Sequence, residues 1–170
     1  MKAKHSATYV AQAAIIAALY VVLTYLASLM GIANGVIQVR FSEMMCILPI
    51  FTSAAVPGLF VGCIISNVIA GGVIWDVIFG SIATLIGAIG TRLLRKALIK
   101  GHPVFSFLPP IISNALIIPF ILAYAYKMED SIPFMMGTVG LGELISVGVF
   151  GSILYITVRK YKNVLFPNEK

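Results

Sequence analysis

The chain has 170 residues, of which 60% are hydrophobic and 11% are charged, and its mean hydropathy is +1.03. Soluble domains are typically about 45–50% apolar and about 25% charged, so this composition excludes an ordinary water-soluble domain and predicts a membrane protein. The net charge of +6 alone would fit a nucleic-acid-binding protein, but its distribution along the chain indicates membrane orientation instead. Cys46 and Cys63 lie inside apolar runs, which favours structural roles over a disulfide or a metal site.

The first apolar run covers residues 8–30, which is long enough to cross a hydrocarbon core roughly 30 Å thick. It exceeds the apolar core of a signal peptide, usually about 7–15 residues, and more apolar sequence follows it, so we predict a retained helix. Apolar sequence resumes from Met44 to Ile69. This stretch permits one kinked helix or two helices, at 43–52 and 55–70. Pro57 favours two, because proline disfavours helical geometry in the residue before it.

Three further apolar runs cover residues 73–95, 104–126 and 132–158. Six spans place both termini on one side of the membrane, together with ten of the twelve basic residues: Lys2, Lys4, Arg92, Arg95, Lys96, Lys100, Arg159, Lys160, Lys162 and Lys170. Arg40 and Lys127 then fall outside, whereas a five-span arrangement would expose one of the basic clusters. By the positive-inside rule we predict one all-α membrane domain, residues 1–170, with six transmembrane helices and both termini in the cytoplasm.

The first helix carries a narrow stripe of small residues. Its members are Ala7, Ala11, Ala14 and Ala18, with Ala13 and Ala17 beside them. Small residues permit close approach of helices in lipid. The stripe therefore predicts either a seam inside the bundle or a strip on which another membrane protein docks.

Several polar residues fall within the predicted spans, although such residues are costly in lipid and usually have a function or a partner. They are Glu43, Asn67, Asp76, Asn114 and Glu143, and the predicted topology gathers them in the outer half of the membrane. A channel needs polar lining along its full depth, so this distribution predicts a pocket open to the outside. Purely structural roles are the alternative: an Arg40–Glu43 ion pair, a helix cap by Asp76 and an interhelical hydrogen bond by Asn114.

The predicted pocket combines carboxylates and amides with nearby aromatic side chains, namely Trp75, Phe79, Tyr124 and Phe134. Carboxylates accept hydrogen bonds from N–H groups, amides bind carbonyls, and aromatic rings stack on flat ligands. The pocket thus suits a polar heterocycle or a cationic amine, and it does not suit a phosphorylated anion.

Several segments of the chain resemble the QueT family, whose members are substrate-binding S components of energy-coupling factor (ECF) transporters. These segments are Gln38–Glu43, Leu48-Pro49, Ala55–Cys63, Asn67, Trp75–Ser81 and Leu108-Pro-Pro with Asn114. The resemblance implies uptake of queuosine precursors, which are 7-deazaguanine bases, through the bacterial cytoplasmic membrane. It also implies an ECF transmembrane coupling subunit, docked on the alanine stripe, and two cytoplasmic ATPases. The absence of a Gly-x-x-x-x-Gly-Lys motif from the sequence fits ATP hydrolysis by such partners.

With this resemblance, we expect Glu143 and Asn114 to bind the edge of the base, and Asp76 or Glu43 to bind its remaining donors. Trp75 or Phe79 would stack on the base, and Asn67 belongs to the same polar group. Arg40 has two possible roles, pairing with Glu43 or contacting the ligand carbonyl.

Three other functions are alternatives to this one. An S component for another vitamin-like heterocycle fits the same pocket chemistry. A self-sufficient carrier needs intramembrane charge reachable from both sides, which the bare inner half disfavours. An enzyme needs a catalytic constellation that the spans lack. We therefore expect no catalytic residues, metal, cofactor or nucleic-acid partner.

Overall fold

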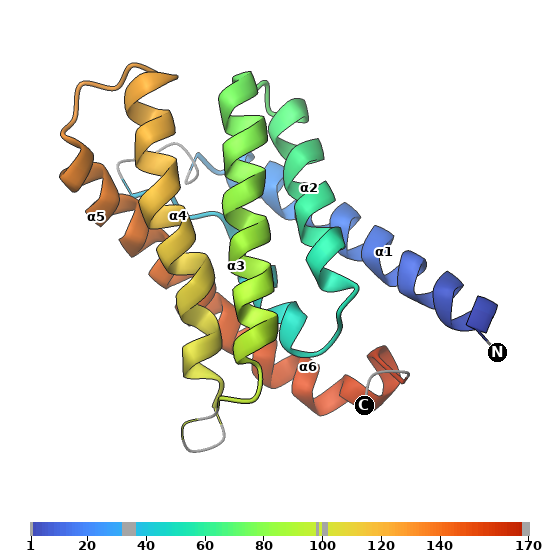
Figure 1. Ribbon diagram of the computed structural model, residues 1–170. Helices are drawn as coiled ribbons and strands as arrows, with labels where there is room; N and C mark the ends of the chain where they lie inside the picture. The colour runs from blue at the N-terminus through green and yellow to red at the C-terminus, as the bar shows by residue number, and fades with distance from the viewer. Residues whose placement is uncertain (1, 32–36, 98, 100–101, 168–170) are drawn as a thin grey trace.

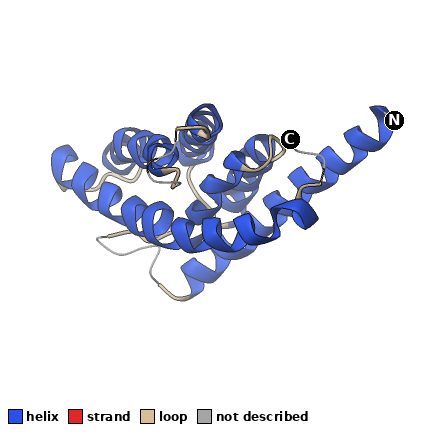
Figure 2. Ribbon diagram, turned by 90° about the horizontal axis from the view of Figure 1, so that it is seen from below, coloured by secondary structure: helices blue, strands red, loops and turns tan. Residues whose placement is uncertain are grey.

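The computed structural model describes residues 2–31, 37–97, 99 and 102–167. Lys100 and Lys170, two of the basic residues used above for orientation, lie outside these ranges. Every regular element in the described ranges is a helix (Figures 1 and 2). In chain order the elements are α1 (Lys2–Leu29), η1 (Phe41–Ile50), α2 (Ala55–Ile69), η2 (Asp76–Gly80), α3 (Ser81–Leu94), α4 (Val104–Tyr124), α5 (Ile132–Glu143), η3 (Leu144–Phe150) and α6 (Gly151–Leu165).

Three of these elements are not α-helical. η1 is a 3-10 helix, and η2 and η3 are π-helical turns. η2 leads directly into α3, and η3 joins α5 to α6 in one continuous helix. The element expected at 73–95 is therefore η2 with α3, and the element expected at 132–158 continues to Leu165.

Four helical segments are long and apolar enough to cross a membrane: Ala7–Leu29, Asp76–Leu94, Val104–Tyr124 and Ile132–Leu165. η1 and α2 are shorter apolar helices of 10 and 15 residues. Most of η1 is buried among the other helices, so little of it faces lipid. The all-helical class is confirmed, with four candidate spans, whereas six membrane crossings remain a prediction.

The ambiguous stretch between Met44 and Ile69 contains two separate helices, which meet at residues 51–54. The backbone N–H of Ala54 donates to Oγ1 of Thr52, at 3.2 Å, which stabilises the turn between them. Pro57 lies in the first turn of α2, where the backbone N–H groups have no partner within the helix in any case.

Small residues bring α1 against α2. A Cβ on Gly58 would lie 2.7 Å from the carbonyl oxygen of Ala13, and one on Gly62 would lie 3.0 Å from that of Ala17. Ala13 and Ala17 therefore belong to an internal seam. The stripe residues Ala7, Ala11, Ala14 and Ala18 are instead exposed on the other side of α1.

α3 and α4 also pack closely, through glycine against proline. A Cβ on Gly87 would lie 2.7 Å from Cα of Pro110, and one on Gly90 would lie 2.4 Å from Cβ of Pro109. The main hydrophobic core forms around η1, whose Cys46 and Ile47 are completely buried, together with Leu59 of α2.

The helices alternate in direction, so the connections gather at two ends of the bundle (Figure 1). In Figure 1 the lower end holds the start of α1, the end of α6, the end of α3 and the start of α4. The upper end holds the α2–α3 connection and the α4–α5 connection. Figure 2 shows α1 extending beyond the other helices at its N-terminus.

Candidate ligand-binding site

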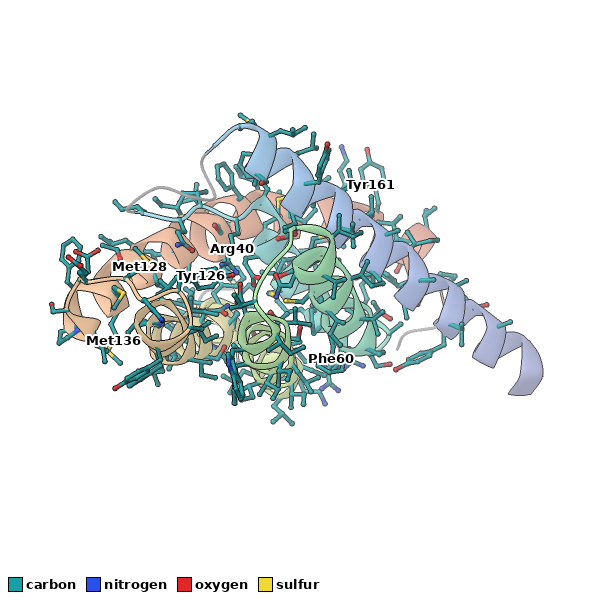
Figure 3. All side chains as sticks on the ribbon, turned by 90° about the horizontal axis from the view of Figure 1, so that it is seen from above. Arg40, Phe60, Tyr126, Met128, Met136 and Tyr161 are labelled. Atoms are coloured by element: carbon teal, nitrogen blue, oxygen red, sulfur yellow. The ribbon has the colours of Figure 1, made fainter. Side chains whose placement is uncertain are left out.

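A cavity of about 520 Å³ opens among the helix termini of the upper end, within the usual 300–1,000 Å³ range of small-molecule sites. Its polar lining residues are Tyr20, Thr24, Ser28, Gln38, Arg40, Ser42, Ser66, Asn67, Asp76 and Tyr126. Seen from above, Arg40 and Tyr126 lie near the middle of the bundle, whereas Phe60 lies at its edge (Figure 3). The cavity therefore joins residues from four parts of the chain: α1, the segment before η1, the α2–η2 region and the end of α4.

Arg40 supplies the positive charge of the cavity wall. Its backbone N–H donates to Oγ of Ser146, at 3.1 Å, and its Nη2 donates to Oε1 of Gln38, at 3.3 Å. Burial lowers the pKa of Arg40, but the neighbouring charges of Asp76 and Glu43 outweigh this effect and raise it. The guanidinium therefore stays charged at any physiological pH.

Asp76 is the carboxylate that lines the cavity directly, and it is 8% exposed. The hydroxyl of Tyr126 donates to its Oδ2 at 3.0 Å, and Nδ2 of Asn67 donates to its backbone oxygen at 3.2 Å. Gly80 leaves space beside it, since a Cβ there would lie 3.0 Å from Oδ1. Burial, and secondly the charge of Asp76, raise the pKa of Tyr126 above its ordinary value.

Glu43 lies behind Tyr20, at the start of η1, and is 1% exposed. The Tyr20 hydroxyl donates to Oε1 of Glu43, and Sγ of Cys46 donates to Oε2 at 3.1 Å. The carboxylate is thus held by two neutral donors. The Arg40 guanidinium donates to Gln38, and it interacts with Glu43 electrostatically.

Glu143 and Asn114 form a second buried polar pair, 5% and 2% exposed. Their side chains are close enough to interact, yet neither Oε2 of Glu143 nor Nδ2 of Asn114 has a partner at hydrogen-bonding distance. Buried polar atoms are nearly always hydrogen-bonded, so these two atoms, an acceptor and a donor, need an explanation. A ligand that offers one N–H and one carbonyl would satisfy both.

Close backbone packing places this pair next to the cavity wall. A Cβ on Gly142 would lie 2.1 Å from the carbonyl oxygen of Gln38, so α5 rests directly on the segment that carries Arg40. The Arg40–Ser146 hydrogen bond ties the same segment to η3. Glu143 also interacts electrostatically with Arg40, which is one of the residues that line the cavity.

Two of the three carboxylates adjoin π-helical turns. Asp76 is the first residue of η2, and Glu143 immediately precedes η3. A π-helical turn shifts the side chains that follow it around the helix axis, and such turns are frequent at functional sites.

Two aromatic residues expected to stack on a ligand lie elsewhere. Trp75 and Phe79 are 55% and 43% exposed and stack on each other, with ring centroids 6.0 Å apart. They line a separate apolar groove together with Phe120 and Tyr124. Successive residues of a helix point about 100° apart, so an inward Asp76 directs Trp75 away from the cavity. Phe134, the remaining aromatic residue considered, is 51% exposed.

Sequence reasoning did not select the two aromatic residues that do line the cavity, Tyr20 and Tyr126. Each combines a ring with a hydroxyl, which suits a half-buried polar wall. Tyr20 looks like an ordinary apolar position within the first span. Tyr126 follows the last apolar residues of α4, and its position at a helix end was the available signal.

Comparison with known proteins agrees with this architecture. The family described as "QueT transporter" matches residues 10–160. The "Queuosine precursor transporter QueT" of Lactococcus lactis subsp. cremoris (strain MG1363) is 34% identical over 160 residues, covering 86% of this chain and 92% of the relative. No solved structure matches the chain. The match covers most of the sequence and the apolar helices, so the chain is a multi-pass bacterial membrane protein, a transporter rather than an enzyme, and belongs to the QueT transporter family.

Proposed function

We propose that this protein is the substrate-binding S component of an ECF importer and that it captures a queuosine precursor, a 7-deazaguanine base, in the cavity at its upper end. The similar Lactococcus protein is named a queuosine precursor transporter, which supports the substrate class. The observation that carries the proposal is the pair of buried atoms without hydrogen-bond partners, Glu143 Oε2 and Asn114 Nδ2, in helices of which α5 packs directly on the Gln38 segment of the cavity wall.

The chemistry of a 7-deazaguanine base matches these residues. Its guanine-like edge presents adjacent N–H donors and a carbonyl acceptor. A Glu143 carboxylate accepts from the N–H groups, and the Asn114 amide donates to the carbonyl. Asp76 or Glu43 then serves the remaining donors of the ligand. Tyr126 is better placed than Trp75 or Phe79 to stack on the base, because it lines the cavity.

The distribution of charge supports an outward-facing cavity. Most basic residues of the described chain lie at the lower end, where Arg92 is in the last turn of α3, Arg95 follows it, and α6 carries Arg159, Lys160 and Lys162; Arg40 and Lys127 lie at the upper end. The positive-inside rule then puts the lower end, with both termini, in the cytoplasm. In this arrangement η1 and α2 complete six crossings, and the cavity opens to the outside.

The exposed alanine stripe supports a membrane partner. Ala7, Ala11, Ala14 and Ala18 present a face of α1 that the described residues leave exposed, because the internal seam uses Ala13 and Ala17. A helix of an ECF transmembrane coupling subunit packs closely on such a face. Two cytoplasmic ATPases would then supply the energy for transport.

The first test measures ligand binding to the purified protein in detergent by thermal shift and calorimetry. The panel contains queuine, its 7-deazaguanine precursors, guanine and several vitamins. We expect submicromolar binding of one 7-deazaguanine and a loss of at least tenfold in affinity for Glu143→Gln. Glu129→Gln, the same change at an exposed position, is the control and should bind normally. If only a vitamin stabilises the protein, the proposed substrate class is wrong and the S-component role is kept. If the isolated chain transports the ligand without partners, the protein is a carrier and not an S component.

The partner is tested separately by co-purification with the coupling subunit and ATPases. Ala14→Leu should abolish assembly while leaving ligand affinity unchanged, because Ala14 is exposed and remote from the cavity lining. Thr157→Leu is the control: it also introduces a leucine at an exposed position, on α6, and this variant should assemble normally. Normal assembly of Ala14→Leu would argue against docking on the stripe.

A further inference from the structure

We infer that the apolar groove beside Trp75 is a binding site for a membrane phospholipid, which lays one acyl chain between η2 and α4. The groove has a volume of about 520 Å³. Trp75 and Phe79 form one wall, and α4 forms the other with residues that include Leu116, Phe120 and Tyr124. This site is not the polar cavity, and the inference does not depend on the proposed substrate.

The groove lies where the chain meets the hydrocarbon of the membrane. One wall belongs to the candidate span Asp76–Leu94, which Trp75 immediately precedes, and the other belongs to the candidate span Val104–Tyr124. These two spans lie side by side (Figure 1). The aromatic residues of the groove are exposed in the isolated chain. In the membrane, lipid therefore meets them instead of water.

The lining of the groove changes with depth as a lipid does. Trp75 and Tyr124 stand at the upper ends of their segments, and each carries one hydrogen-bonding group on its aromatic ring. Phe79 and Phe120 lie about one helical turn deeper. Apart from Trp75 and Tyr124, the described side chains that line the groove are those of phenylalanine, leucine, isoleucine and alanine. This order matches an acyl chain below a polar headgroup region, where tryptophan and tyrosine are enriched in membrane proteins.

The sizes of the lining residues favour a flexible chain over a helix of another protein. Helices in lipid pack through small residues, and this chain does so at Gly58 and Gly62 against α1 and at Gly87 and Gly90 against α4. The groove is lined by large side chains, except for Ala125. A rigid helix therefore cannot approach closely here, whereas an acyl chain bends to fill the space.

Both walls are ordered before a lipid binds. Trp75 stacks on Phe79 with ring centroids 6.0 Å apart, and Phe120 stacks on Tyr124 with ring centroids 6.5 Å apart. Rings that already hold each other lose little conformational freedom when a ligand contacts them, which lowers the cost of binding. The groove is therefore preformed for one chain.

Trp75 is the single tryptophan of the chain, so its fluorescence reports on the groove. Bromine quenches tryptophan on contact, and the full chain in dodecyl maltoside is titrated with phosphatidylglycerol brominated on one acyl chain. We expect quenching by at least half, which saturates near one lipid per protein.

The reference protein moves the reporter out of the groove. Trp75→Phe combined with Phe134→Trp places it on α5, at a position that is 51% exposed, close to the 55% of Trp75. Its quenching should rise in proportion to the lipid content of the micelle, without saturation. The same proportional rise for Trp75 in the wild type would overturn the inference.

A pair of variants then tests the wall on α4. Phe120→Ala removes a ring of the groove and should raise the lipid concentration at half-maximal quenching at least fivefold. Phe105→Ala makes the same change in the same helix, outside the groove and at the same 45% exposure, and should titrate like the wild type. Equal titrations of the two variants would overturn the inference. So would a dimer, detected by light scattering, in which Trp75 is not quenched, because a second copy would then fill the groove.

Discussion

Replacing Gly142 by alanine should distort the cavity wall, although Gly142 does not line the cavity. A Cβ at this position would lie 2.1 Å from the carbonyl oxygen of Gln38 and 2.9 Å from its carbonyl carbon. Real contacts of a Cβ are essentially never shorter than 3.0 Å, so α5 and the Gln38 backbone must separate by about 0.9 Å. The Gln38 atoms belong to the backbone, and the position of an alanine Cβ is fixed by its own backbone, so no side-chain rotation relieves the contact.

The expected cost follows from this geometry. Overpacking in a tight interior typically costs about 1–3 kcal/mol. The displaced segment carries Arg40, whose N–H bonds Ser146 at 3.1 Å, so the shift moves the cation of the cavity wall. If about 1.4 kcal/mol of the cost falls on the ligand-bound state, affinity drops tenfold. Thermal unfolding and calorimetry with the preferred base measure the two effects.

Gly137→Ala is the matched control, since it makes the same change in the same helix. A Cβ at Gly137 would meet nothing within 4 Å. Alanine is favoured over glycine in a helix by roughly 0.5–1 kcal/mol, so this variant should be as stable as the wild type or more stable. Wild-type affinity and stability in Gly142→Ala would refute the close packing of α5 on the cavity wall.

Three further predictions test the surrounding structure. Gly90→Ala places a Cβ 2.4 Å from Cβ of Pro109 and should lower the free energy of unfolding by about 1–3 kcal/mol in denaturant titrations; an unchanged midpoint would contradict the α3–α4 contact. Tyr20→Phe removes a donor from a buried carboxylate and should cost about 1–3 kcal/mol, whereas Tyr25→Phe, at a 57% exposed position, should be neutral. The pKa of Tyr126 is raised, so the stability that its neutral hydroxyl contributes should be complete below the ordinary tyrosine pKa and lost as pH rises through the raised pKa. The difference in unfolding free energy between the wild type and Tyr126→Phe, measured against pH, checks this. A loss of that difference centred on the ordinary tyrosine pKa would refute it.

The helical architecture was predictable because apolar run length and proline position have direct physical consequences. Pro57 indicated a break, and the structure begins α2 two residues before it. The 3-10 geometry of η1 was not predictable. η1 and α2 are also too short to qualify as spans by themselves. Burial among neighbouring helices, which a single sequence does not display, allows η1 to be short.

The candidate site was predictable in its ionisable residues but not in its aromatic ones. Carboxylates and amides in lipid are costly, which is why Asp76, Asn67 and Glu143 were identified from the sequence. Aromatic residues are common on both lipid-facing and cavity-facing surfaces. Helix rotation turns Trp75 away from the cavity beside the inward Asp76, whereas Tyr126 lines the cavity from the segment that follows α4. The π-helical turn at residue 76 makes that rotation harder to deduce.

The most direct test of the account is an experimental structure of the protein with the preferred 7-deazaguanine bound. We predict that the base lies in the cavity at the upper end, with its N–H edge toward Glu143 and Asn114 and with Asp76 or Glu43 at its remaining donors. A base bound in the apolar groove beside Trp75, or at the lower end of the bundle, would contradict the central claim.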